Sequence, residues 1–154
     1  MIFQGMEQGI YECYGMFDRE TIVGYSYLIR LDTDYLIDYL ATDPICRNKG
    51  YGGILIELLR AKLTDATSII GEVEDPSCAK CEEDRLLQDR RYHFYLRNGF
   101  RDTNVRAVCF GVPFRIIETG KGLVHDEEVI KVLYKRHYQS ILPKQMYEKH
   151  VQVV

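Results

Sequence analysis

The chain has 154 residues, of which 46% are hydrophobic and 28% charged, and its formal net charge at pH 7 is -3. This length and balance predict one ordered domain with a buried core and argue against a disordered chain. The slightly acidic charge provides no basic surface for a phosphate backbone, so we expect no nucleic-acid partner. The apolar runs fall short of the roughly 20 residues of a membrane helix. Because the N-terminus also lacks the pattern of a signal peptide, we expect a cytoplasmic protein with no membrane partner.

The five cysteines are an odd number and are scattered through the chain, which favours free thiols in a reducing compartment. Cys78 and Cys81 have the spacing of metal ligands, but no second CxxC or HxxxH follows them. We therefore expect no metal. A small zinc-binding interaction protein built on these two cysteines is kept as an alternative.

The first third of the chain is predicted to be a β-meander. Runs rich in tyrosine and β-branched residues over 10–17 and 21–31 flank a polar turn and should pair as a hairpin. A third strand is predicted over 35–42, where side chains alternate between two faces. Three antiparallel strands thus precede the first helix.

Past Gly50 the apolar residues recur every three or four positions, which predicts an amphipathic helix of about four turns. The order strand, helix, strand then places a strand over 68–73 parallel to its neighbour. The later predicted elements are a loop over 76–85, a helix over 86–98 that ends at Gly99, and strands over 100–110 and 112–118.

A break at 120–122 separates a tail from this pattern. Asp126 is the predicted N-cap of a helix with one apolar face, and a final strand is predicted over 146–154. We therefore divide a single domain into a core, 1–118, and a C-terminal helix-strand extension, 119–154.

The turn before the first helix combines glycines with cations. It consists of Arg47, Asn48, Lys49, Gly50, Tyr51, Gly52 and Gly53. Glycines let a backbone approach a phosphate closely, and a helix N-terminus attracts anions. The same turn is also consistent with a plain strand-to-helix connection. A Walker loop needs Lys and Ser or Thr after the glycine, and a dinucleotide fingerprint needs glycine where Leu55 stands, so neither fits.

Arg47-x-x-Gly50-x-Gly52 resembles the RxxGxG motif of the GNAT acetyltransferases, and Phe94-Tyr95-x-x-x-Gly99-Phe100 resembles their second motif. The motifs lie in the family's order, and the resemblance covers residues 10–118. It implies an α/β (α+β) fold, the acyl-CoA N-acyltransferase fold, with a central mixed, mostly antiparallel sheet flanked by helices. It also implies an enzyme that transfers the acetyl group of acetyl-CoA to an amine by direct attack in a ternary complex.

By the same resemblance, the turn 47–53 would hold the pyrophosphate of acetyl-CoA. The backbone of Leu40, Ala41 and Thr42 would hold its pantetheine arm, in a gap where this strand splays from the next. A backbone N-H there would also stabilise the oxyanion.

Amine attack on a thioester needs a general base and a general acid. Tyr95 matches the position where the family often has its acid, although a packed structural tyrosine is the alternative. For the base, Glu72 is our first choice among the acidic residues expected to face the cleft, with Glu74 and Asp38 nearby. The alternative roles for Glu72 are to bind a cationic substrate, to pair with Arg91 or to relay a proton to water.

The sequence departs from the family in three places. Family members usually begin with a strand and two helices that wall the acceptor site, and here the hairpin starts too early for them. Gln88 stands where the family often has asparagine, and the tail matches no family motif. The tail could replace the missing wall within one chain or by exchange in a homodimer, which we favour. The acceptor, a small-molecule or peptide amine, stays open, and a non-catalytic acyl-CoA-binding module or subunit is the competing class.

Overall fold

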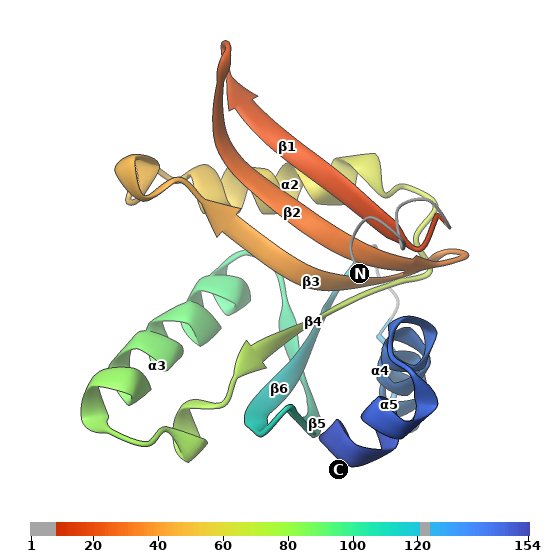
Figure 1. Cartoon of the computed structure of the whole chain (residues 1–154). Coiled ribbons are helices and arrows are strands. Elements are labelled where there is room, and N and C mark those ends of the chain that lie inside the picture. Colours follow the sequence, from red (N-terminus) through yellow and green to blue (C-terminus); the bar gives the residue numbers. More distant parts are fainter. Residues whose placement is uncertain (1–8, 121–123) are drawn as a thin grey trace.

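The computed structural model describes residues 9–120 and 124–154, which build a seven-stranded sheet with helices on both faces (Figure 1). The strands are β1 (Tyr11–Asp18), β2 (Thr21–Leu31), β3 (Asp34–Thr42), β4 (Ser68–Glu74), β5 (Arg101–Cys109), β6 (Val112–Thr119) and β7 (Val151–Val153). The helices are α2 (Tyr51–Lys62), α3 (Glu82–Arg97), α4 (Glu127–Ile141) and α5 (Lys144–His150), with 3-10 turns η1 (Pro44–Cys46) and η2 (Pro76–Cys78).

The sheet order is β1-β2-β3-β4-β6-β5-β7. Strands β3 and β4 pair in parallel, and the other neighbouring pairs of the described chain are antiparallel. This mixed, mostly antiparallel sheet confirms the predicted fold class. Helix α2 supplies the crossover between the two parallel strands, as the order strand, helix, strand requires.

Each face of the sheet has its own apolar core. The core under α2 and α3 contains Leu28, Ile37, Leu55, Ile56, Leu59 and Ile69, with Phe94 and Tyr95 of α3 at its margin. The core under α4 contains Ile29, Leu36, Ile70, Ile116, Ile130, Leu133 and Tyr134. We call these two sides of the sheet the α2 face and the α4 face.

Strands β3 and β4 separate halfway along their length. Their parallel pairing runs from Asp34 opposite Ser68 to Ile37 opposite Gly71 and stops there. Both strands continue, β3 to Thr42 and β4 to Glu74, and they diverge toward their C-terminal ends (Figure 1). The gap that the family resemblance implies is therefore present, and it opens beside Leu40, Ala41 and Thr42.

The C-terminal helix packs against the sheet of its own chain. Asp126 caps α4 by accepting a hydrogen bond from the backbone N-H of Val129 at 2.9 Å, as its sequence position predicts. Helix α4 lies over part of the α4 face (Figure 1), and its Ile130, Leu133 and Tyr134 pack into the core there. The tail thus packs within one chain, which is the first of the two arrangements that the sequence analysis left open.

Several predicted boundaries are wrong. Helix α3 begins at Glu82 rather than residue 86, because Cys81 caps it and the acidic first turn that looked like a loop suits a helix N-terminus. The predicted strand over 146–154 is mostly helix α5, and only Val151–Val153 pairs with β5. Of the break at 120–122, residues 121 and 122 lie outside the described residues.

Candidate active site

The glycine turn presents a helix N-terminus without a side-chain cap. Asn48 and Gly50 both adopt positive φ, 63° and 79°, and Gly50 is the N-cap of α2 with no side-chain cap hydrogen bond among the described residues. The first main-chain bond of the helix runs from the N-H of Ile54 to the carbonyl of Gly50 at 3.2 Å. The N-H groups at the start of α2 therefore remain available to an anion, with the exposed cations Arg47 and Lys49 beside them.

Two glycines of this turn have a packing role that the sequence did not reveal. A Cβ on Gly52 would lie 2.8 Å from the ring of Phe94, and a Cβ on Gly53 would lie 2.6 Å from Oδ1 of Asn98. Both partners belong to the C-terminal end of α3. These glycines let α2 and α3 approach closely, so their presence alone does not establish phosphate binding.

Tyr51 links the turn to the β1-β2 hairpin. Its hydroxyl donates a hydrogen bond to Oδ2 of Asp18 at 2.7 Å. An open groove of about 670 Å³ lies between the two segments, and its wall includes Arg19, Glu20, Cys46 and Lys49. This hydrogen bond joins the turn to the hairpin beside the C-terminal end of β3.

Glu72 lies on β4 just beyond the last residue pair with β3, and α4 holds its carboxylate. Tyr134 donates a hydrogen bond to Oε2 at 2.7 Å, and Tyr138 donates one to Oε1 at 2.5 Å. Burial raises the pKa of Glu72 to about 7, although the two tyrosine bonds act in the opposite direction and Asp38 adds to the rise. A carboxyl that titrates near neutrality suits a general base.

Asp38 comes from a β-bulge on the other side of the gap. Tyr39 pairs with Tyr27 and Ile37 pairs with Leu28, so Asp38 is the extra residue of β3. Burial raises its pKa as well. Asp38 and Glu72 therefore lie near each other across the gap, as the sequence analysis predicted.

Glu74 has a different environment, although the sequence grouped it with Glu72. Its Oε1 accepts a hydrogen bond from Nη1 of Arg91 at 3.1 Å, and its Oε2 accepts one from Nε2 of Gln88 at 2.8 Å. The ion pair with Arg91 that we considered for Glu72 is therefore made by Glu74. Gln88, which replaces the family's asparagine, uses its amide on the same carboxylate.

Tyr95 lies on the α2 face, on the opposite side of the sheet from Glu72. Its ring packs edge-on against Phe94 and Phe100, with ring centroids 5.3 and 5.2 Å apart. Burial raises its pKa, and Arg91 opposes this weakly, so the hydroxyl is protonated at neutral pH. The two side chains predicted to be catalytic therefore lie on opposite faces of the sheet.

Sequence reasoning missed three residues around Glu72. Tyr134 and Tyr138 lie on the apolar face that was predicted for the tail helix, but no partner was predicted for their hydroxyls. Cys109 of β5 is also buried near this carboxylate, and burial together with Glu72 raises its pKa to about 11. A signal was available, because two tyrosines one turn apart on a buried helix face need partners for their hydroxyls.

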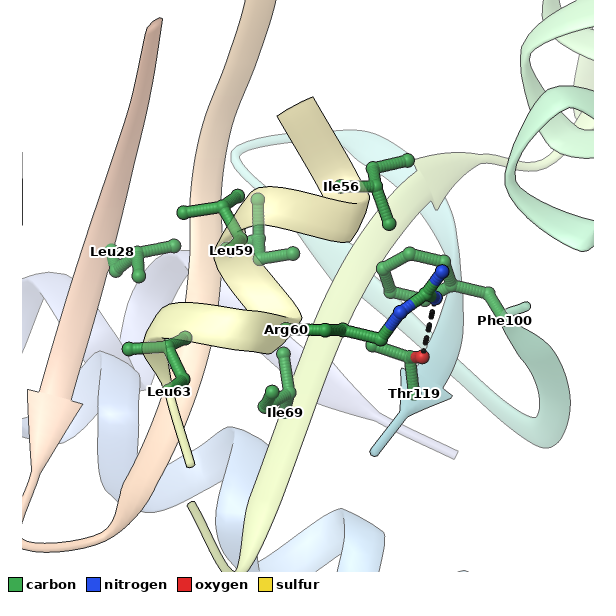
Figure 2. Close-up of a pocket in the computed structure, with 9 residues that line it drawn as sticks. Leu28, Ile56, Leu59, Arg60, Leu63, Ile69, Phe100 and Thr119 are labelled. Carbon is green, nitrogen blue, oxygen red and sulfur yellow. Dashed lines mark hydrogen bonds between the residues drawn. The ribbon is translucent and has the colours of Figure 1, made fainter. Parts of the chain in front are cut away.

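A second pocket, between α2 and the sheet, is structural. Its volume is about 10 Å³, room for no more than a water molecule, and apolar side chains surround it (Figure 2). Arg60 reaches along its edge and donates from Nη1 to the carbonyl of Asn98 at 2.5 Å and to Oγ1 of Thr119 at 3.1 Å. Arg60 therefore ties α2 to the C-terminal end of α3.

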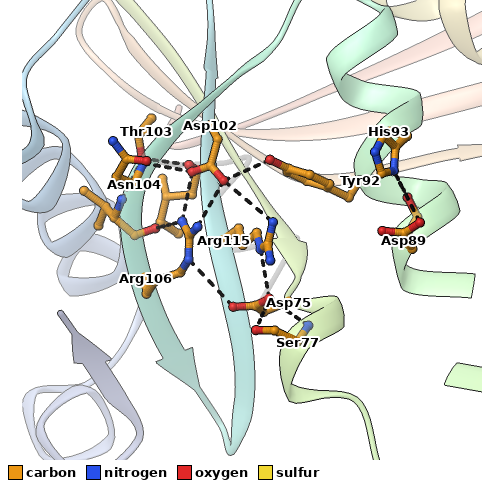
Figure 3. Close-up of polar contacts among 12 residues, drawn as sticks. Asp75, Ser77, Asp89, Tyr92, His93, Asp102, Thr103, Asn104, Arg106 and Arg115 are labelled. Carbon is orange, nitrogen blue, oxygen red and sulfur yellow. Dashed lines mark hydrogen bonds and ion pairs between the residues drawn. The ribbon is translucent and has the colours of Figure 1, made fainter. Parts of the chain in front are cut away.

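A charged cluster at the far end of the sheet is also self-contained (Figure 3). Arg115 donates to Asp75 at 2.8 Å and lies 4.6 Å from the ring centroid of Tyr92. Asp102 accepts hydrogen bonds from Arg106 at 2.9 and 3.1 Å and from Tyr92 at 3.0 Å. These four charged groups pair with one another, and the cluster joins the N-cap of η2 to β5, β6 and α3.

The two spaced cysteines sit at helix boundaries. Cys78 ends η2, and Cys81 caps α3 by accepting from the N-H of Asp84 at 3.5 Å. Across residues 9–120 and 124–154, no group of three His, Cys, Asp or Glu side chains is arranged to hold a metal ion. In the same residues, no helix is long and apolar enough to cross a membrane.

Comparisons with known proteins agree with this architecture. The family model described as an acetyltransferase (GNAT) domain matches residues 9–102. A comparison with curated protein sequences gives no match. The family match spans the meander, the glycine turn, both motif-bearing helices and the start of β5, which is more than half of the chain.

Solved structures share the fold. A GNAT-family protein from Bacteroides thetaiotaomicron superposes with a TM-score of 0.63 at 25% identity, covering 84% of this chain and 72% of that one. A GNAT family acetyltransferase from Elizabethkingia anophelis, solved with acetyl-CoA bound, gives 0.59 at 18% identity, covering 77% and 82%. The ribosomal-protein-S18-alanine N-acetyltransferase from Escherichia coli gives 0.59 at 13% identity, covering 81% and 78%.

The fold, the gap between β3 and β4 and the family match lead to one conclusion. The chain belongs to the GNAT acetyltransferase family.

Proposed function

We propose that this chain is an N-acetyltransferase that moves the acetyl group of acetyl-CoA to an amine by direct attack in a ternary complex. The observation that carries the proposal is the open edge of β3 at Leu40, Ala41 and Thr42, which leads to the uncapped N-terminus of α2. Relatives solved with coenzyme A or acetyl-CoA bound have the same fold.

The residues present fit such a donor. The N-H groups at the start of α2, with Arg47 and Lys49, would bind the pyrophosphate. The unpaired edge of β3 would hydrogen-bond the pantetheine arm as an extra strand would. The thioester would then lie in the gap, between Glu72 on one face and Tyr95 on the other.

The chain's own groups would then move two protons. The ammonium form of the acceptor first releases one proton to solvent, and the lone pair of the neutral amine attacks the thioester carbon. As the carbon-nitrogen bond forms, Glu72, as a carboxylate, accepts one N-H proton, directly or through water. A backbone N-H of the β3 edge stabilises the oxyanion. As the carbon-sulfur bond breaks, Tyr95 donates its proton to the departing sulfur, and the products are an N-acetyl amide and free thiol.

The test starts with binding of coenzyme A, measured by calorimetry. Gly52→Val is unsuitable, because the new side chain would also clash with Phe94. We instead expect the double variant Arg47→Glu, Lys49→Glu to weaken binding about tenfold or more at low salt, with a smaller loss at high salt. The control is Lys135→Glu, which reverses one charge on the exposed side of α4 and should bind coenzyme A like the parent chain.

Turnover is then measured as acetylated product with a panel of amines. Equal affinity of the folded double variant and the parent chain would refute the phosphate site. Binding without product from any amine would instead identify a non-catalytic acyl-CoA-binding module, which is the competing class.

A further inference from the structure

The α4 face of the sheet is only half covered. Helix α4 covers the half that contains Ile29, Leu36 and Ile70. Over the other half, toward the hairpin end of β1 and β2, large side chains remain exposed. These are Phe17 (62% exposed), Ile22 (48%), Tyr25 (37%) and Tyr39 (52%), with Tyr27 half-buried between them. We call these five residues the tyrosine platform.

The pairing and alternation of the strands show that the platform shares a face with Glu72. Tyr25 and Tyr27 alternate with residues of the α2 core and therefore lie on the same side of β2 as Ile29. Tyr39 pairs directly with Tyr27, and a Cβ on Gly15, opposite Tyr25, would meet the side chains of Phe17 and Ile22. The platform is therefore continuous across β1, β2 and β3.

The tyrosine rings form one surface. Tyr25 stacks on Tyr39 with centroids 5.8 Å apart and meets Tyr27 edge-on at 5.6 Å, while Tyr27 and Tyr39 are 6.5 Å apart. Such contacts hold the rings in place before any ligand arrives. A pre-formed aromatic surface binds flat or apolar groups with little loss of side-chain entropy.

The two faces of the sheet offer different surroundings at the gap. On the α2 face, Leu40 and Tyr95 pack partly buried against the core, and this side leads to the N-terminus of α2, where the coenzyme would bind under the proposed function. On the α4 face, Asp38 adjoins Tyr39 in the chain, and Glu72 lies next to Asp38 across the gap. The two carboxyl groups thus mark the boundary between the covered half and the platform.

We propose that the tyrosine platform is the acceptor site and that it selects a primary amine carried on an aromatic or similarly flat apolar body. The inference rests on the proposed acetyl transfer. The ammonium group is drawn to Asp38 and Glu72, while the body of the acceptor stacks on Tyr25 and Tyr39. A polyamine or an aminoglycoside carries further ammonium groups along its length that need anionic partners, and none of the five platform side chains is charged.

The test compares 2-phenylethylamine with ethylamine, which offers the same amine without the ring. The parent should acetylate the aryl amine with the higher kcat/KM. Because one aromatic contact contributes about 0.5–1.5 kcal/mol, each of Tyr25→Ala and Tyr39→Ala should lower the ratio of the two kcat/KM values roughly twofold to twelvefold. Both residues are exposed, so the variants should fold. Leu58→Ala, on the outer side of α2 and 51% exposed, is the matched control and should keep the parental ratio.

The outcomes separate this inference from the proposed function. Coenzyme A binding without acetylation of either amine counts against the proposed transfer itself. Acetylation of both amines at equal efficiency, or a ratio unchanged in both tyrosine variants, overturns the aromatic acceptor site. A preference for spermidine over 2-phenylethylamine overturns it as well. A change in sedimenting mass with unchanged kcat/KM in the variants would show that the platform joins two copies of the chain, which also overturns it.

Discussion

Removing one tyrosine hydroxyl from the Glu72 site should shift the pH dependence of catalysis. Tyr138→Phe keeps the ring, which lies 4.9 Å from the Tyr134 ring, and deletes the donor that contacts Oε1 of Glu72 at 2.5 Å. The remaining donor, Tyr134, still contacts Oε2 at 2.7 Å. The carboxylate then has one partner in place of two in the same partly buried setting.

The size of the shift follows from the balance at Glu72. Burial raises the pKa to about 7, while both tyrosine bonds lower it, since they stabilise the charged form. A hydrogen bond to a charged group contributes about 1.5–3 kcal/mol, and one pKa unit corresponds to about 1.4 kcal/mol. The neutral acid also keeps some hydrogen bonding, so we expect the pKa of Glu72 to rise by about one unit in Tyr138→Phe. The ionised fraction at pH 7 then falls from about one half to about one tenth.

The assay measures kcat/KM between pH 5.5 and 9.5, with the acetylated amine quantified by chromatography. In the pH profile of Tyr138→Phe, the acidic limb should move to higher pH by about one pH unit. The value of kcat/KM should then fall about fivefold at pH 7 and change little at pH 9.5. Because the same amine is used throughout, its own ionisation affects all variants equally. Tyr147→Phe, on α5, is the control and should retain the parental limb. A uniform loss at every pH, with the limb unmoved, would refute Glu72 as the base.

Three further predictions concern stability and assembly. The raised pKa of Glu72 means that its protonated form favours folding below the ordinary value of 4.5 and that this stability is lost as pH rises through about 7. At pH 8, Glu72→Gln should therefore increase the free energy of unfolding by up to about 3 kcal/mol and raise the Tm above that of the parent. Both gains should vanish near pH 4. Arg60→Met removes the donor to the Asn98 carbonyl and should cost about 1–3 kcal/mol in urea unfolding, whereas an unchanged midpoint would show that the contact contributes nothing. In sedimentation at micromolar concentration, the packing of α4 on its own sheet predicts a monomer, and a twofold mass would favour the exchanged homodimer.

The sequence predicted the elements whose apolar pattern and end signals agree. Thr21–Leu31 was predicted with both of its ends, and the N-cap at Asp126 was also correct. The wrong boundaries lie where local polarity and helix capping conflict. The acidic run at Glu82 reads as a loop by hydrophobicity, yet it is favourable in the first turn of a helix. The segment over 146–154 was predicted as a strand, but most of it is helix α5, which packs against α4, and no local pattern shows that contact.

The candidate site also has features that the sequence could predict and features that it could not. The glycine turn could be found from spacing, because a helix N-terminus with flanking cations is a local feature. The packing of Gly52 on Phe94 could not, because the two residues belong to different helices. The partners of Glu72 lie 62 and 66 residues away in the chain, so no local pattern connects them. What the sequence did contain was the requirement that buried tyrosine hydroxyls find partners.

The tail helix therefore has two effects that a deletion would mix. Removing α4 would expose the core at Ile29, Leu36 and Ile70 and would also strip both donors from Glu72. Loss of activity after such a deletion would not show whether the wall or the hydroxyls matter. The single-atom change in Tyr138→Phe keeps the wall and alters only the charge balance of Glu72. If that variant moves the acidic limb while its Tm stays close to the parental value, the helix that closes one half of the sheet also sets the protonation of the base at its edge.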